Sequence, residues 1–86
     1  MVLNQTAILT GHAEPLTGVS FSIDGKTIAT SSEDRTIRLW DPVTGRERAV
    51  LATHTDSVLL AAFLSGGEML LSVGREGAVK MWHAPR

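Results

Sequence analysis

The sequence predicts an all-β protein built from two similar four-stranded antiparallel units, and three observations lead to this prediction. Residues 8–41 align without a gap on residues 50–83, so the chain contains an internal repeat with a period of about 42 residues, a length typical of four-stranded repeat units. Segments such as residues 36–40 alternate apolar and polar side chains, as half-buried strands do. Turn-forming residues separate these segments, and no segment has the apolar stripe of an amphipathic helix.

The two repeats share residue classes more than identities. Ile28-Ala29-Thr30 aligns with Leu70-Leu71-Ser72, and Ile37-Arg38-Leu39 aligns with Val79-Lys80-Met81. Because apolar residues of strand-forming type recur at matching places, each repeat is expected to form the same strands. The identical pairs include Leu9 and Leu51, His12 and His54, Phe21 and Phe63, Gly25 and Gly67, and Trp40 and Trp82.

The spacing of apolar residues also predicts an irregularity at the start of each repeat. Leu16, Val19 and Phe21 are spaced by three and then two residues, and the second repeat has the same offsets from Val58 through Ala61 to Phe63. Since side chains alternate along a strand with a period of two, a β-bulge near residues 17–18 and 59–60 would bring each set onto one face. Strands are expected near residues 3–9, 16–22, 27–32, 36–40, 46–51, 58–64, 69–73 and 78–82.

Composition argues against several classes of function. Eight basic and nine acidic residues give a net charge of −1, and charges do not gather in runs, so neither nucleic acid nor an anionic membrane is an expected partner. The longest apolar run, residues 58–64, is far shorter than a membrane helix, and the N-terminus lacks the pattern of a signal peptide. We therefore expect a soluble, cytoplasmic protein. The absence of cysteine excludes disulfides and thiol chemistry, and no cofactor is expected.

The first repeat strongly resembles the WD-repeat β-propeller family. The residues that carry the resemblance are Gly11-His12, the Leu16/Val19/Phe21 spacing, Asp24-Gly25, residues 30–34 and Leu39-Trp40-Asp41. The resemblance implies a buried relay of hydrogen bonds formed by His12, Thr30, Asp34 and Trp40, and by His54, Ser72, Glu76 and Trp82 in the second repeat. Such a relay is chemically consistent, because a hydroxyl can accept from an indole N–H and donate to an imidazole whose other nitrogen donates to a carboxylate.

The second repeat departs from the family pattern at three places. Thr53 replaces the glycine, Glu76 stands where Asp34 stood, and His83 ends the strand in place of Asp41. Because glutamate is longer and has more rotamer freedom, we expect the second relay to be distorted or open to water and the second unit to be the softer one.

The resemblance also implies that two blades need further blades to close a ring. In the family phase, residues 1–9 form an outer strand that completes a blade of a neighbouring copy, residues 10–51 form blade one, and residues 52–86 supply three inner strands of blade two. We therefore expect a homo-oligomer with swapped N-terminal strands, of three copies (six blades) or four (eight), with four slightly preferred. Two alternatives stay open: a piece of a longer or engineered propeller that only self-assembles, and a single eight-stranded β-sandwich.

Catalysis and metal binding are not expected from these residues. His12, His54 and His83 have no paired ligand spacing, and the carboxylate pairs Asp34 with Asp41 and Glu33 with Asp24 fall partly in turns, where Asp24 and Asp41 can bind backbone N–H groups. Ser31-Ser32 lacks a nucleophile-elbow context. The chain is therefore predicted not to be an enzyme and to have neither catalytic nor metal-binding residues.

The leading expectation is a noncatalytic protein–protein interaction scaffold. The family's usual docking face, carried over, gives the rim candidates Pro15, Thr17, Glu33, Ser57, Leu59 and Arg75. Leu59 beside Arg75 would suit an apolar anchor of a bound peptide, and packing between copies is the alternative role for Leu59. A carbohydrate-binding propeller ranks last, because Trp40 and Trp82 are assigned to relays and both phenylalanines to the core.

Overall fold

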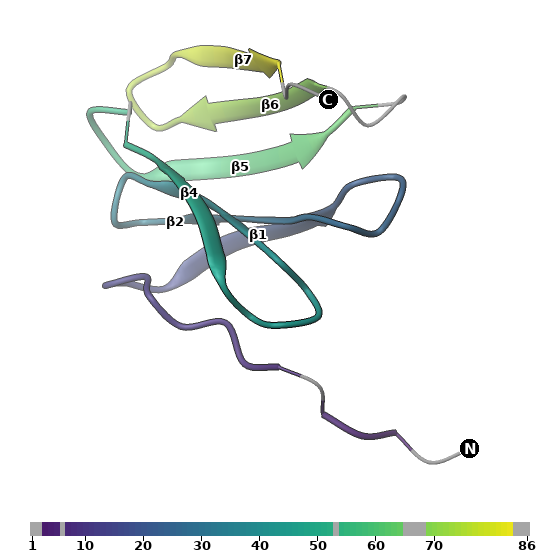
Figure 1. The fold of residues 1–86 in the computed structure, drawn as a ribbon. Coiled ribbons are helices and arrows are strands. Elements are labelled where there is room, and N and C mark those ends of the chain that lie inside the picture. Colours follow the sequence, from purple (N-terminus) through teal and green to yellow (C-terminus); the bar gives the residue numbers. More distant parts are fainter. Residues whose placement is uncertain (1–2, 6, 53, 65–68, 84–86) are drawn as a thin grey trace.

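The computed structural model describes residues 3–5, 7–52, 54–64 and 69–83, and these residues form seven β-strands in two antiparallel sheets (Figure 1). The all-β prediction is confirmed, and seven of the eight expected strands are present. They are β1 (Leu16–Phe21), β2 (Ile28–Ser32), β3 (Ile37–Trp40), β4 (Glu47–Leu51), β5 (Val58–Phe63), β6 (Met69–Gly74) and β7 (Val79–His83). The described residues contain no helix that is long and apolar enough to cross a membrane.

The first repeat forms a four-stranded meander in the order β1-β2-β3-β4. Short aspartate turns connect its strands, as the sequence predicted. Asp24 Oδ1 accepts hydrogen bonds from the Ser22 hydroxyl at 2.6 Å and from the Lys26 N–H at 2.9 Å. Asp41 Oδ1 accepts one from the Val43 N–H at 2.8 Å. Each carboxylate therefore stabilises its own turn.

The second repeat forms a three-stranded meander, β5-β6-β7. The predicted bulges are confirmed in both sheets, because the pairing register shifts between Leu16 and Gly18 in β1 and between Val58 and Leu60 in β5. The extra residues are Thr17 and Leu59. With the bulge in place, Leu16, Val19 and Phe21 lie on one face of their sheet, as expected.

Each sheet has two faces, which strand register identifies because directly paired residues point to the same side. We call the face that carries the hydroxyl and the tryptophan of the relay the relay face, and the opposite one the back face. In the four-stranded sheet the relay face bears Leu16, Val19, Phe21, Ile28, Thr30, Arg38 and Trp40, and the back face bears Gly18, Ser20, Ala29, Ser31, Ile37 and Leu39. In the three-stranded sheet the relay face bears Val58, Ala61, Phe63, Leu70, Ser72, Lys80 and Trp82, and the back face bears Leu60, Ala62, Leu71, Val73, Val79 and Met81.

The two sheets stack with β5 against β1 and β2 (Figure 1). The back face of the four-stranded sheet supplies Ala29 and Ile37 to the core, and the relay face of the three-stranded sheet supplies Val58, Ala61 and Leu70. Polar contacts also cross this interface: Ser20 Oγ accepts from the Phe63 N–H at 3.0 Å. The core of the chain is therefore the contact between two unlike sheet faces.

The segment near residues 3–9, which is expected to complete a blade of a neighbouring copy, forms no strand within its own chain among the described residues, and its pairing with another copy stays a prediction. Residues 3–5 and 7–9 have no strand pairing and extend away from the sheets in Figure 1. The reason is topological: the segment aligns with β4 of the next repeat, and the edge that it would pair with belongs to a preceding blade that this chain does not contain. Within its own chain it passes the turn between β3 and β4, where Ile8 O lies near Gly45.

Candidate functional site

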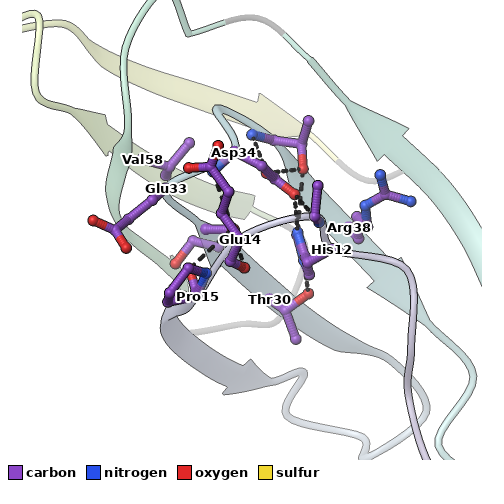
Figure 2. A network of polar contacts seen from close by, with 12 residues as sticks. His12, Glu14, Pro15, Thr30, Glu33, Asp34, Arg38 and Val58 are labelled. Carbon is purple, nitrogen blue, oxygen red and sulfur yellow. Dashed lines mark hydrogen bonds and ion pairs between the residues drawn. The ribbon is translucent and has the colours of Figure 1, made fainter.

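The four predicted relay residues of the first repeat lie together, and Figure 2 shows three of them, His12, Thr30 and Asp34. His12, in the loop before β1, contacts Asp34 through Nδ1 at 2.8 Å and Thr30 through Nε2 at 2.6 Å. Trp40 Nε1 donates to the same Thr30 hydroxyl at 2.8 Å. The contacts connect the loop before β1 with β2, β3 and the turn between them, so four separate segments are tied by three short hydrogen bonds.

The donor and acceptor roles in this relay are assigned from its two end groups, the Trp40 indole and the Asp34 carboxylate. Trp40 can only donate, so the Thr30 oxygen accepts from it and gives its own proton to His12 Nε2. The Asp34 carboxylate can only accept, so His12 Nδ1 carries the other proton. This assignment comes from the hydrogen-bond network, and in it His12 Nδ1 donates and His12 Nε2 accepts.

Asp34 is the most heavily bonded carboxylate of the site. It also accepts from the N–H groups of Ala13, at 3.1 Å, and of Thr36, at 2.9 Å, and from the Thr36 hydroxyl. Burial by itself raises the pKa of Asp34, but the hydrogen bonds from Thr36, His12 and Ala13 outweigh it and hold the pKa far below its usual value. Sequence reasoning missed Thr36, although a threonine two residues after an aspartate is a recognisable turn signal.

The second repeat also forms a complete relay. His54 contacts Glu76 through Nδ1 at 2.6 Å and Ser72 through Nε2 at 2.8 Å, and Trp82 Nε1 donates to Ser72 at 3.0 Å. The expected distortion is therefore wrong. The hydrogen bond from His54 is the largest influence on Glu76 and lowers its pKa. The Glu76 side chain is nonetheless more exposed than that of Asp34, at 21% against 8%, so it is partly open to water as expected.

Two small neighbours accommodate the longer carboxylate. Gly74 stands where the first repeat has Ser32, and Ala78 stands where it has Thr36. A Cβ atom on Gly74 would collide with the Glu76 carboxylate and with the imidazole of His54. In the first repeat the same position carries the Ser32 hydroxyl, which donates to Pro15 O at 3.0 Å. The longer side chain of Glu76 thus occupies space that is free because Gly74 has no side chain.

The six rim candidates lie along one edge of the two sheets. The Glu33 N–H donates to Pro15 O at 3.1 Å, and the Arg75 N–H donates to Ser57 O at 2.9 Å, so each repeat pairs its loop with its turn in the same way. Ser57 Oγ reaches Glu33 O at 3.4 Å and joins the two repeats. Pro15, Glu33, Leu59 and Arg75 are exposed to solvent.

Thr17 and Leu59 are the bulge residues of the two repeats, and their surroundings differ. The Thr17 hydroxyl donates to Val58 O at 2.7 Å and shares a hydrogen bond with Ser31 Oγ at 2.8 Å. It is therefore part of the contact between the sheets. Leu59 holds the equivalent place on the three-stranded sheet, which favours a role for Leu59 in packing against a further blade.

The remaining histidine, His83, is not one of the predicted relay residues. His83 ends β7 and is exposed. Among the described residues, no three His, Asp or Glu side chains are grouped so that they could hold a metal ion.

The Trp40→Phe substitution tests the relay. It removes the indole donor, and we expect the free energy of unfolding to fall by about 1–3 kcal/mol, because the buried Thr30 hydroxyl loses a partner. His12→Ala should cost at least as much, since it leaves both Thr30 and Asp34 without the imidazole. Urea denaturation at one fixed protein concentration measures the change, with the exposed Val43→Ala as control. Losses under about 0.5 kcal/mol, the size usual for surface changes, would count against the relay as a source of stability.

A double-mutant cycle tests whether Gly74 and Glu76 depend on each other. Gly74→Ser alone should destabilise the protein by about 1–3 kcal/mol through overpacking, and Glu76→Asp alone should weaken the contact with His54. The double variant restores the residue types of the first repeat and should be more stable than the sum of the two losses predicts. Additive losses in urea denaturation would show that the two positions act independently. Ser32→Gly with Asp34→Glu is the matched control in the first repeat.

The comparisons with known proteins agree with the geometry. The family described as "WD domain, G-beta repeat" matches residues 3–41 and again residues 45–83. Coronin-7 of Mus musculus is 36% identical over 76 residues, and Periodic tryptophan protein 2 of Arabidopsis thaliana is 36% identical over 75 residues. Each alignment covers 87% of this chain and 8% of the relative, so the chain spans a small part of the length of these relatives.

Among solved structures, the crystal structure of the computationally designed Ika4 protein is similar to this chain, with a TM-score of 0.79 and 26% sequence identity. The similarity covers 95% of this chain and 49% of that one. The sequential order of strands within each repeat, the two relays and the double family match are those of propeller blades, and they argue against the β-sandwich alternative. This chain belongs to the WD-repeat family.

Proposed function

We propose that the chain is a noncatalytic protein-interaction scaffold whose two blades become part of a closed propeller ring. Proteins of this family usually act as scaffolds for protein interactions and are generally noncatalytic. One relative, the SIR4-interacting protein SIF2 of Saccharomyces cerevisiae, carries an interaction in its name and is 27% identical over 77 residues. The two relays support the proposal physically, because they hold the loops of the rim to rigid strands.

The main support for the proposed ring is a difference in solvent exposure between equivalent residues of the two sheets. Leu16 and Val19 on the four-stranded sheet are 51% and 58% exposed, whereas their counterparts Val58 and Ala61 on the three-stranded sheet are 0% and 2% exposed. The second set is buried because another blade covers it. The first set has the same place in its repeat and lacks only the neighbour.

The three-stranded sheet needs a fourth strand as well. Within the described part of the chain, β7 is the edge strand of its sheet, whereas β3, its counterpart, lies between β2 and β4. Residues 3–9 align with β4, and their described members are unpaired. The proposed arrangement therefore has residues 3–9 of one copy pairing with β7 of the next, in a ring of four copies or, as the second choice, three.

The ring predicts the mass of the protein in solution. Light scattering should give three or four times the chain mass of 9.2 kDa. Deletion of residues 1–9, or their replacement by a glycine-serine stretch of equal length, should abolish the ring because β7 loses its partner strand. A folded monomer of the wild-type chain would contradict the ring, and an unchanged ring after deletion would contradict the swapped strand.

The scaffold role is tested separately by a pull-down with the assembled protein. We expect partners that are retained reproducibly and lost on Arg75→Glu, because the exposed guanidinium lies on the proposed docking rim. Glu14→Gln, which also changes an exposed charge of a loop, is the control. Retention of no partner by a correctly assembled ring would leave self-assembly as its only property and would refute the scaffold role.

A further inference from the structure

The carboxylate of the first relay is held at both of its oxygens. Asp34 Oδ1 accepts hydrogen bonds from the N–H and the hydroxyl of Thr36. Asp34 Oδ2 accepts from His12 Nδ1 and from the Ala13 N–H (Figure 2). The donors come from the turn after β2 and from the loop before β1, so the carboxylate joins these two segments through several bonds at once.

The carboxylate of the second relay has less support from its surroundings. Glu76 Oε2 accepts from His54 Nδ1 at 2.6 Å. The place of Thr36 is taken by Ala78, so the hydroxyl that reinforces Asp34 has no counterpart in this turn. The contact between Glu76 and the loop before β5 therefore depends mainly on the imidazole of His54.

A second difference lies beside the relays. In the first repeat the Ser32 hydroxyl donates to the carbonyls of Glu14 and Pro15, both at 3.0 Å, and so binds the loop before β1 to the end of β2. The corresponding residue of the second repeat is Gly74, which has no side chain to make such a bond. If the contact of Glu76 opened, the hydrogen bond from the Arg75 N–H to Ser57 O, at 2.9 Å, would still join the turn to the loop.

Glu76 is also the relay carboxylate that water and other charges reach more easily. Its side chain is more exposed than that of Asp34. The charged or titratable groups on the elements around Glu76 are His54 and Asp56 in the loop before β5, Arg75 in its own turn and Lys80 in β7. The hydrogen bond from His54 lowers the pKa of Glu76 most, and the charge of Lys80 lowers it further.

The sign of the pH effect is the same for both carboxylates. A carboxyl group whose pKa is lower in the folded chain than in the unfolded chain stabilises the fold at neutral pH, and this stabilisation is lost as the pH falls through the folded pKa. Folding lowers the pKa of Asp34 and that of Glu76. Because Asp34 has more donors, its relay should withstand a lower pH than the relay of Glu76.

We propose that the second relay is acid-sensitive: on acidification the contact between Glu76 and His54 opens while the first relay stays closed, and the turn that carries Arg75 is loosened from the loop before β5. The inference concerns the relays within one chain and does not depend on the ring. Thr36 acts as a positioning residue that keeps Asp34 bonded in the first relay. Acid would thus divide the rim into one half that stays in place and one half that opens.

The two tryptophans of the chain allow the relays to be followed separately, because each indole N–H belongs to one relay. An NMR titration of the isotope-labelled full chain follows both indole signals, which Trp40→Phe and Trp82→Phe assign. We expect the Trp82 signal to change as the pH falls below about 4.3, the ordinary pKa of glutamate. The Trp40 signal should change about one pH unit lower or more, because one hydrogen bond to a carboxylate lowers its pKa by about that much. Simultaneous changes, or a change of Trp40 first, would overturn the proposal.

Hydrogen exchange gives a second measurement on the same sample. The Arg75 amide donates to the loop before β5, and the Glu33 amide makes the equivalent bond to Pro15 O in the first repeat. We expect exchange at Arg75, corrected for the intrinsic effect of pH, to accelerate together with the change of the Trp82 signal, while Glu33 stays protected. Equal acceleration at both amides would contradict the separate opening of the second relay.

Glu76→Gln tests which group is responsible for the transition. The amide oxygen can still accept from His54 Nδ1, but it does not titrate, so the Trp82 signal should stay unchanged through the pH range in which the wild type changes. A transition that persists in Glu76→Gln would assign it to another group, such as His54, and would overturn the proposal. Glu33→Gln is the matched control, since it removes an exposed rim carboxylate outside the relays and should leave both transitions where they are.

Thr36→Val tests why the first relay opens later. It removes the hydroxyl bonded to Asp34 and keeps the backbone N–H, so the Trp40 signal should change about one pH unit higher than in the wild type. Thr36→Ser keeps the hydroxyl and should behave as the wild type. No shift in Thr36→Val, or the same shift in Thr36→Ser, would refute the role of Thr36. If Thr36→Val does not fold by circular dichroism, the wild-type titration and Glu76→Gln still decide the proposal.

Discussion

A blade is a sheet with two apolar faces, and the need to cover both of them governs this molecule. A strand alternates its side chains between the two sides, so a meander that buries one face leaves the other facing water unless a neighbour covers it. Here the contact between the two sheets covers one face of each. The chain forms a core from that contact and keeps two further faces that are apolar and uncovered. The contact that gives the chain its core therefore leaves two largely apolar faces in water.

The relays meet a different requirement, because they place polar groups inside an otherwise apolar face. An indole N–H, a hydroxyl, an imidazole and a carboxylate would each be costly to bury alone, and together each supplies the partner that the next one needs. The carboxylate end also stays charged, since the hydrogen bonds to Asp34 outweigh the effect of burial on its pKa. The result holds the loop before β1 and the turn between β2 and β3 in fixed positions, which a rim for binding requires.

The sequence predicts the features that depend on residue type at a fixed spacing. The step from Leu16 to Val19 is enough to predict a bulge, and the spacing from His12 to Trp40 carries the relay through its resemblance to a known family. Features that depend on local space were not predictable in this way. Glu76 suggested a distorted relay, and only the structure shows that Gly74 makes room for it. Residues 3–9 have the pattern of a strand, but a strand also needs an edge to pair with, and this edge is not supplied by the same blade.

The fit between Gly74 and Glu76 has a consequence for how such repeats diverge. If the two repeats exchanged segments, a crossover between positions 74 and 76 would join the serine of one version to the glutamate of the other. That combination would put two groups in one volume. A stepwise change from the first version of this turn to the second therefore avoids the collision only if the glycine comes before the longer acid.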